Sequence, residues 1–339
     1  MRPSFVPRLV NGPFDDPALF IPFLFQHRAV IFDLGDLAAL SSRDVLKTTH
    51  VFVTHTHMDH FVGFDRLLRL FLGREQTLSL YGPEGFLKNV EGKLAGYSWD
   101  LVHNYDTRLT LKVTEVHPEQ LLQRSYRCER SFAPDGSHLV EPWQSDLVKE
   151  PAMTVSAVVL DHSTACLGFK ISESFHVNIR AERLSANGLR PGPWLQHFKE
   201  ALYRRKPAET SIEAEKIDGG RTRFRLGDLQ DDVAVITAGQ TVCYITDVSF
   251  TASNVASIIA FASGADHLFI EAAFLEADRQ IAKAKNHLTA RQAGEIAGMS
   301  KVKLLTAFHF SPRYQGQAHL LEAEAQNAYR EALRANRPD

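Results

Sequence analysis

Four side chains of types that bind metals in many proteins lie within six residues of this chain: His55, His57, Asp59 and His60. They directly follow the apolar run Val51–Val53, which is typical of a buried strand that ends at the rim of a sheet. Imidazole nitrogen and carboxylate oxygen are ligands for zinc and similar divalent ions. Because so much imidazole is costly to bury without a partner, the spacing predicts a metal site, against the alternative of a polar turn that happens to be rich in histidine.

Three further candidate ligands each stand at the end of an apolar run: His162 after residues 155–160, Asp247 after residues 242–245 and His309 after residues 304–308. Taken singly, each would more often be a hydrogen-bonded core histidine or a turn aspartate. Taken with the first group, they supply enough ligands for two metal ions. We predict that one ion is held by His55, His57 and His162, that the other is held by Asp59, His60 and His309, and that Asp247 bridges the two.

Two neighbouring divalent ions have a clear use in phosphoester hydrolysis, because together they lower the pKa of a water molecule and neutralise charge that develops on the phosphate. Asp59 is then expected to accept a proton from the attacking water. Glu271 and His287 are a candidate pair in which a carboxylate fixes the tautomer of an imidazole and raises its basicity. A charged His287 would stabilise the transition state or protonate the departing oxygen. The alternative is an exposed histidine near the start of the helix that Thr289 leads.

The composition is that of an ordinary folded protein. Of the 339 residues, 44% are hydrophobic and 23% charged, so the chain has ample material for one large α/β domain or two smaller ones. A net charge of −2 excludes a protein that is basic as a whole, so any affinity for nucleic acid must come from a local patch. The three cysteines form no disulfide framework, and no apolar run reaches the length of a signal core or membrane span; both observations favour a soluble, cytoplasmic protein.

Alternating apolar patterns predict an α/β protein in which strands and helices follow each other in both halves of the chain. Two runs, at 19–25 and 29–34, predict a hairpin. Further strands are predicted at 50–54, 78–81, 109–116, 153–160, 233–236, 241–246, 267–271 and 303–308, and helices at 43–47, 61–72, 83–94, 289–299 and 318–334.

Residues 180–232 interrupt this alternation with a long insertion, of a kind that is usually functional or mobile. Between 180 and 206, seven Lys or Arg stand against two Glu, a local net charge of +5. A basic run of this kind is usually a solvated face. The other interpretation is an RNA-binding surface, for which the candidate residues are Arg183, Arg190, Lys199, Arg204, Arg205 and Lys206.

The pattern His-x-His-x-Asp-His at residues 55–60 resembles the metallo-β-lactamase superfamily of metallohydrolases. Two later segments are more specific, because His287-Leu-Thr-Ala-Arg-Gln-Ala and Ser311-Pro-Arg-Tyr resemble the ribonuclease Z branch, the tRNA 3′-processing endonucleases. The resemblance covers most of the chain. It implies an α/β fold of the αββα sandwich type, with two mixed sheets and helices outside. It also implies a single hydrolase domain over residues 1–339, with an inserted arm at 180–232 that serves this family as a tRNA-binding exosite.

The resemblance also implies the reaction and its partners. The expected cofactors are two divalent ions, zinc in the first place with manganese or iron as alternatives; the expected substrate is pre-tRNA, and the related enzymes are commonly homodimers. The chain departs from the family's glycine-rich turns at its start and after residue 34, and it has Gly63-Phe-Asp-Arg-Leu in place of Gly-Leu-Pro-Gly-Leu. These departures leave the predicted metal ligands unchanged, but they alter segments that are expected to line the substrate pocket. A smaller phosphodiester is therefore the alternative substrate, and an RNA-binding protein without activity is a third interpretation.

Overall fold

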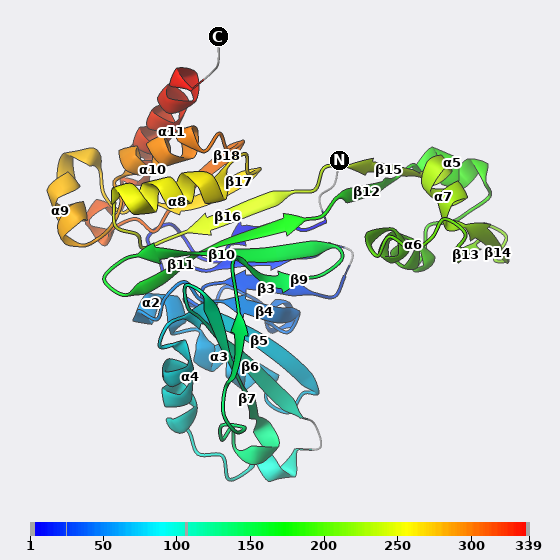
Figure 1. Cartoon of the computed structure of the whole chain (residues 1–339), viewed down its shortest axis with the longest axis horizontal. Helices are drawn as coiled ribbons and strands as arrows, with labels where there is room; N and C mark the ends of the chain where they lie inside the picture. The colour runs from blue at the N-terminus through cyan, green and yellow to red at the C-terminus, as the bar shows by residue number, and fades with distance from the viewer. Residues whose placement is uncertain (1–3, 25, 106–107, 337–339) are drawn as a thin grey trace. The chain divides into compact units, whose positions relative to one another are not determined.

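The computed structural model describes residues 4–24, 26–105 and 108–336 (Figure 1). The chain divides into two compact units. The larger one comprises Phe5–Asp146, Ser156–Lys170 and Val242–Asp339, and the smaller one is built mainly from Ile171–Thr241. No helix in the described ranges combines the length and the apolar character that crossing a membrane requires.

The first large sheet has eight strands whose spatial order follows the chain from β1 to β8. Strands β3 to β6 run parallel to one another, and antiparallel pairs complete both edges, so the sheet is mixed. The predicted hairpin is confirmed, since β2 and β3 pair antiparallel with Leu19 opposite Phe32. The strands span Arg8–Leu9, Leu19–Pro22, Ala29–Phe32, Thr48–Phe52, Gln76–Pro83, Leu109–Val116, Gln120–Arg127 and Leu139–Pro142.

The second large sheet has six strands in the order β18-β17-β16-β11-β10-β9. Because β16, β17 and β18 are parallel, their carboxyl ends meet at one edge of this sheet. In chain order, β9 to β11 span Asp146–Lys149, Met153–Asp161 and Ala165–Glu173, and β16 to β18 span Thr241–Ile245, His267–Glu271 and Leu304–Phe308.

The two sheets pack face to face through buried aromatic rings. Phe32 and Phe52 of the first sheet contact Phe169 of the second, with ring centroids 5.4 and 5.5 Å apart. Tyr244 of β16 lies 5.9 Å from Phe32, and all four side chains are fully buried. Burial of rings this large is worth about 2 kcal/mol for each side chain, so this layer holds the sheets together.

Helices cover the outer face of each sheet (Figure 1). Helices α1 (Ser42–Val45), α3 (Phe64–Phe71) and α4 (Phe86–Ala95) share a core with the first sheet, and α8 (Ala252–Ala262), α10 (Ala290–Met299) and α11 (Ala318–Ala335) share one with the second. In α3 the apolar side chains recur at helical spacing, and those of Phe64, Leu67, Leu68 and Phe71 are buried. The predicted αββα sandwich is therefore confirmed.

The smaller unit has a hydrophobic core of its own, which the sequence analysis does not predict. Strands β12 (His176–Ile179) and β15 (Ala234–Thr237) pair antiparallel, and β13 (Ser211–Glu215) and β14 (Arg221–Arg225) form a hairpin. Helices α5 (Ala181–Ala186), α6 (Trp194–Tyr203) and α7 (Leu226–Val233) complete it. The core is formed by side chains that include Leu184, Trp194, Phe198, Leu202 and Leu229. The expected arm at 180–232 lies within this unit.

Candidate metal centre

The histidine-rich motif occupies the turn between a buried strand and a short helix. Strand β4 ends at Phe52, and the chain then passes through His55 and His57 to α2 (Met58–Phe61), which carries Asp59 and His60. Helix α2 has only four residues, so it serves to turn the two side chains toward the same edge as His55. His55 and His60 are fully buried, which histidine rarely is without a strong partner.

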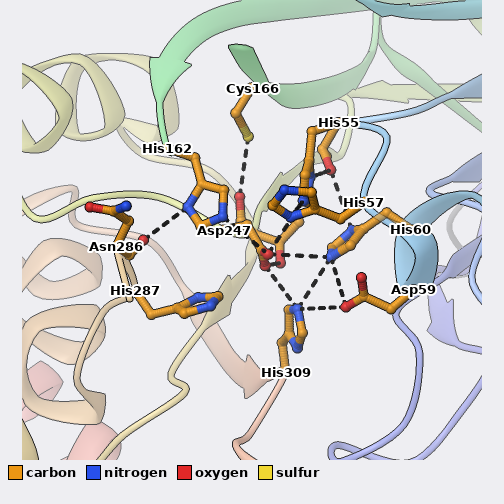
Figure 2. A network of polar contacts seen from close by, with 12 residues as sticks. His55, His57, Asp59, His60, His162, Cys166, Asp247, Asn286, His287 and His309 are labelled. Carbon is orange, nitrogen blue, oxygen red and sulfur yellow. Dashed lines mark hydrogen bonds and ion pairs between the residues drawn. The ribbon is translucent and has the colours of Figure 1, made fainter. Parts of the chain in front are cut away.

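The three later candidates reach the same place from the second sheet (Figure 2). Asp247 lies two residues after Ile245, the last residue of β16, while His309 directly follows β18 and His162 directly follows β10. Because β16 and β18 both run parallel to β17, their carboxyl ends present Asp247 and His309 at one edge. The structure thus brings together all seven candidate ligands that were predicted from the sequence.

The first ligand group contains His55, His57 and His162 together with Asp247, and one ligand atom of each lies within 4.8 Å of the others. Nε2 of His55 lies 3.0 Å from Nδ1 of His57. Oδ2 of Asp247 lies 3.4 Å from Nε2 of His55 and 3.7 Å from Nε2 of His162.

The second ligand group contains Asp59, His60 and His309, again with ligand atoms within 4.8 Å of one another. Nε2 of His60 and Nε2 of His309 face each other at 3.2 Å, and Oδ2 of Asp59 lies 3.4 and 3.6 Å from them. Oδ1 of Asp247 lies 2.8 Å from Nε2 of His309, while Oδ2 faces the first group and also lies 3.5 Å from Nε2 of His60. Asp247 therefore faces both groups, as a bridging ligand would.

The chemistry of these donors fits two divalent cations. Each group directs at least three nitrogen or oxygen lone pairs to a common point, and one proton can satisfy only two of them. A divalent cation satisfies all of them, and nitrogen–oxygen sets of this kind suit zinc, manganese and iron. Burial lowers the pKa of His162, and burial together with the charge of His55 lowers the pKa of His57, so both rings favour the neutral form that binds a metal.

Charges within the cluster shift several pKa values. Burial alone would raise the pKa of Asp247, but His309 and His60 hold it well below its ordinary value. Burial alone would lower the pKa of His60, yet Asp247 and Asp33 raise it well above the usual range. Burial would also raise the pKa of Asp59, but the hydrogen bond and charge of His60 bring it to about 2. Both carboxylates are therefore ionised at neutral pH, as metal ligands must be.

Side chains behind the cluster orient the candidate ligands, and they were not predicted from the sequence. Oδ2 of Asp33 lies 2.9 Å from Nδ1 of His60, and Asp33 also accepts hydrogen bonds from Thr54 and Tyr244. Nδ1 of His162 lies 3.0 Å from the carbonyl of Asn286. Such partners fix the tautomer of a ligand histidine, so its second nitrogen is free for a metal. A signal was available, since Asp33 is a charged residue near the end of the apolar run predicted at 29–34.

The backbone at this edge is itself unusual. Asp33, Asp247 and His309 have φ angles of 58°, 49° and 58°, in the left-handed region that residues with a Cβ rarely adopt. Conformations of this kind cost about 1–3 kcal/mol each and persist where the surrounding structure determines them, which is common at functional sites. Each of the three residues directly or almost directly follows a strand, so the left-handed turn aims the side chain along the edge.

The Glu271–His287 pair lies beside the two groups of candidate ligands. Oε2 of Glu271 is 2.8 Å from Nδ1 of His287, and Oε1 accepts a hydrogen bond of 2.6 Å from the backbone N–H of Val248, next to Asp247. The His287 ring lies 5.3 Å from His162 and 5.9 Å from His309, centroid to centroid. Burial alone would lower the pKa of His287, but the Glu271 carboxylate raises it to about 9. The side chain is only 18% exposed, so it is not the exposed histidine of the alternative interpretation.

The candidate RNA-binding residues lie in the smaller unit, and acidic side chains neutralise part of them. Arg183 pairs with Asp232, Arg190 with Glu215 at 2.8 Å and Arg204 with Glu200 at 2.9 Å. Burial lowers the pKa of Lys199. Across residues 180–232 there are eleven Lys or Arg and nine Asp or Glu, a net charge of +2. Among the residues that the structure describes, Arg205 and Lys206 have no ion-pair partner.

Comparison with known proteins finds relatives over most of the chain. It is 28% identical over 309 residues to a ribonuclease Z of Deinococcus radiodurans, a match that covers 90% of this chain and 86% of the relative. It is 28% identical over 327 residues to a ribonuclease Z of Halalkalibacterium halodurans, covering 94% and 90%. The metallo-β-lactamase fold protein YhfI of Bacillus subtilis superposes with a TM-score of 0.51 at 17% identity, covering 93% of this chain and 86% of that one. No protein-family model matches the chain.

The structure is that of a metallo-β-lactamase fold protein, and two groups of its side chains could each hold a metal ion. Within that fold, the chain is a homologue of the ribonuclease Z proteins over about nine-tenths of its length, as the sequence resemblance predicts.

Proposed function

We propose that this chain is a metal-dependent endoribonuclease of the ribonuclease Z type, which hydrolyses the 3′ extension of pre-tRNA in the cytoplasm. The observation that carries the proposal is the convergence of seven nitrogen and oxygen ligands at one edge of the sandwich. The homology to ribonuclease Z proteins over most of the chain supports the choice of substrate. The Glu271–His287 pair beside the ligands supports the hydrolytic chemistry, because it supplies a charged donor for the departing oxygen.

The proposed cofactors are two divalent ions, zinc in the first place, with manganese or iron as alternatives. His55, His57 and His162 would hold one, Asp59, His60 and His309 the other, and Asp247 would contact both. When bound, such ions supply Lewis acidity that neutralises phosphate charge and makes water a better nucleophile.

The side chains of the chain itself orient the ligands and move protons. Asp59, which its pKa of about 2 keeps ionised, is the proposed acceptor for a proton of the attacking water. His287 is protonated at neutral pH because Glu271 outweighs the effect of burial on its pKa, and it is the proposed donor to the departing oxygen. Asp33 holds His60 in the tautomer whose other nitrogen faces the ligand group.

For residues 180–232 we propose a role in holding the RNA. Arg205 and Lys206, which have no ion-pair partner in the described part of the chain, are available to contact phosphates directly. Arg183, Arg190 and Arg204 would have to exchange their acidic partners for phosphate, which weakens their contribution. Binding through phosphate contacts predicts a strong dependence of affinity on salt.

A smaller phosphodiester is the alternative substrate. The ion pairs within residues 180–232 and the net charge of only +2 favour it, because an RNA-binding arm gains affinity from unpaired positive charge. The same metal ligands would serve either substrate.

The test is cleavage of a 3′-extended pre-tRNA by the metal-loaded protein, with bis(p-nitrophenyl) phosphate as the small phosphodiester. We expect one cut at the 3′ end of the acceptor stem and none with His57→Ala. His319→Ala, which removes an exposed histidine of α11, is the matched control and should behave as the unchanged protein. Hydrolysis of the small ester without any cut in pre-tRNA would favour the alternative, and cleavage that persists in His57→Ala would contradict both.

We also propose that the protein is a homodimer, as the family resemblance implies. Sedimentation equilibrium at micromolar concentration should give a mass of about twice 38.0 kDa, and a monomer would contradict this part of the proposal.

A further inference from the structure

A cavity of about 260 Å³ adjoins the second ligand group. Asp59 and His309 form part of its wall, together with His287. The rest of the wall comes from residues that the hydrolytic chemistry does not use, among them Phe14, Asp15, Asp16, Phe274, Lys285 and Ser311. Its volume is slightly below the about 300–1,000 Å³ of typical small-molecule pockets, so it suits one unit of a chain molecule.

One side of the cavity is the loop at residues 11–17, where the chain departs from the glycine-rich turn of the family. Hydrogen bonds hold this loop in place. Nδ2 of Asn11 donates to the carbonyls of Asp16 and Asp36, both at 2.7 Å. The backbone N–H of Phe310 donates to the Pro13 carbonyl at 2.6 Å. The loop is therefore fastened to the segment that carries His309, and its side chains have fixed positions beside the metal ligands.

Asp16 contributes a carboxylate to this cavity, and no hydrogen-bond donor of the described residues contacts its oxygens. The side chain is half-buried, and within the described ranges no hydrogen bond or ion pair reaches its carboxylate oxygens. Burial and the neighbouring carboxylates of Asp59 and Asp36 raise its pKa. Asp15, in contrast, uses Oδ2 to accept the N–H of Gly12 at 3.1 Å. Asp16 is therefore the acceptor that gains most from a ligand with a hydroxyl or N–H group.

Lys285 brings the opposite charge to the same cavity. It follows α9 (Arg279–Ala284) and is exposed, and no acidic group among the described residues forms an ion pair with it. Phe14 adds an apolar surface, since it is half-buried and packs edge-on against Phe310 with centroids 5.6 Å apart. A hydrogen-bond acceptor, an ammonium group and an aromatic surface thus surround one small cavity.

We propose that this cavity binds the ribonucleotide unit next to the scissile phosphate. Asp16 accepts a hydrogen bond from a ribose hydroxyl, and Lys285 contacts the phosphate of the same unit. This inference rests on the proposed function, because it takes the adjoining ligand group to hold the scissile phosphate. A ribonucleotide fits because its hydroxyls, its phosphate and its base are what an acceptor, a cation and an aromatic surface recognise.

The test measures equilibrium binding of three ligands to the metal-loaded protein by titration calorimetry: AMP, 2′,3′-dideoxy-AMP and adenosine. The readout for Asp16 is the ratio of the dissociation constants of dideoxy-AMP and AMP, in which the contribution of phosphate binding to the metal ions cancels. We expect a preference for AMP of about tenfold or more in the unchanged protein, the size of one hydrogen bond to a charged group. Asp16→Ala should reduce this ratio to about one, and Asp16→Asn, which keeps the shape of the side chain, should give an intermediate ratio.

The readout for Lys285 is the ratio of the dissociation constants of adenosine and AMP. Lys285→Ala should weaken AMP by about tenfold and leave adenosine unchanged. Lys283→Ala, an exposed lysine two residues away, is the matched control and should leave both ratios as they are. Equal weakening of AMP and dideoxy-AMP in both Asp16 variants would overturn the proposal, because Asp16 would then only shape the cavity. Absence of AMP binding at millimolar concentration would overturn it as well.

Failure of this proposal and failure of the proposed function give different results. Ribose preference that depends on Asp16, in a protein that does not cut pre-tRNA, would support the ribonucleotide site and exclude the pre-tRNA substrate. Cleavage of pre-tRNA by a protein without ribose preference would exclude the site and support the substrate.

Discussion

Tyr244 donates its phenolic hydrogen to Oδ2 of Asp33 at 3.1 Å, and the same carboxylate oxygen lies 2.9 Å from Nδ1 of the metal-ligand candidate His60. Tyr244 belongs to the second sheet and Asp33 directly follows a strand of the first, so the contact joins the two layers of the sandwich. All three side chains are fully buried. The phenol thus fixes the carboxylate that in turn fixes the ring orientation of His60.

The first prediction follows from this chain of contacts. Tyr244→Phe keeps the packing of the ring and removes one donor from Asp33, so His60 should be held less firmly. Loss of such an orienting partner typically weakens metal binding by about 10- to 100-fold. Because the substitution also leaves the buried Asp33 carboxylate with one hydrogen bond fewer, it should lower the free energy of unfolding by about 1–2 kcal/mol. Metal affinity is measured by competition with a chromophoric chelator.

Tyr329→Phe is the control for that substitution, because the Tyr329 hydroxyl donates to the Val302 carbonyl at 2.6 Å on another part of the sandwich. It should lower stability without an effect on metal affinity. Equal metal affinity in the two variants would show that Tyr244 contributes to folding alone.

The second prediction concerns the pH dependence of hydrolysis. His287 has a pKa of about 9, above the ordinary 6.5, because Glu271 outweighs the effect of burial. The protonated form therefore prevails at neutral pH, and kcat should fall as the pH rises through about 9. The stability of the fold should depend on pH in the same direction. The contribution of the Glu271–His287 pair to the free energy of unfolding is complete below pH 6.5 and is lost as the pH rises through about 9.

Glu271→Gln removes the charge that raises this pKa. We expect the alkaline limb of the pH–kcat profile to move to lower pH and kcat at neutral pH to fall by about tenfold or more, within the usual range for general acids. Glu295→Gln, whose partner Arg291 lies on the exposed face of α10, should leave the limb unchanged. An unchanged limb in Glu271→Gln would mean that His287 has no part in the proton transfer.

Much of the fold and the ligand set can be predicted because they depend on short stretches of sequence. The strands at 109–116 and 267–271 have the predicted bounds, since their apolar patterns are strong and turn residues flank them. The ligands at residues 55–60 are visible as a cluster. Asp247 and His309 can be expected close to each other because the carboxyl ends of parallel strands in one sheet meet at one edge.

The remaining features depend on contacts that no local pattern announces. In the sequence, Tyr244 is an ordinary aromatic residue of a buried strand. Its hydrogen bond to Asp33 forms only when the two sheets pack together. Strand β7 escapes prediction because most of its side chains are only half-buried and its apolar residues do not alternate. The net charge of +5 at residues 180–206 overstates the charge of the arm, because this range excludes acidic residues such as Glu215 and Asp232. In the folded chain, Glu215 pairs with Arg190 and Asp232 pairs with Arg183.

The third prediction tests the tight packing behind the metal motif. Gly63 precedes α3, and its N–H donates to the Leu34 carbonyl at 2.8 Å. A Cβ at this position would lie 2.2 Å from the backbone oxygen of Gly35, which cannot move aside as a side chain would. Gly63→Ala should therefore lower the free energy of unfolding by about 1–3 kcal/mol, as overpacking does.

Gly92 offers the matched control within helix α4, because a Cβ there would meet nothing within 4 Å. Gly92→Ala should raise stability by up to about 1 kcal/mol through the better helix propensity of alanine. Chemical denaturation of both variants measures the difference. Equal stability of the two would contradict the close approach of Gly63 to the Gly35 carbonyl.

The fourth prediction separates paired from unpaired charge in the arm. Arg205 and Lys206 have no ion-pair partner among the described residues, whereas the neighbouring Arg204 is 2.9 Å from Glu200. If the arm holds RNA, the double variant Arg205→Gln, Lys206→Gln should bind pre-tRNA more weakly and reduce the slope of log affinity against log salt by about one for each lost contact. Arg204→Gln should change the slope less, because its charge is already compensated.

Filter binding over a range of salt concentrations measures both quantities, with hydrolysis of bis(p-nitrophenyl) phosphate as a check that the metal centre is intact. An unchanged slope in the double variant would show that the unpaired charges face solvent, and it would move the RNA contact away from this turn of the smaller unit.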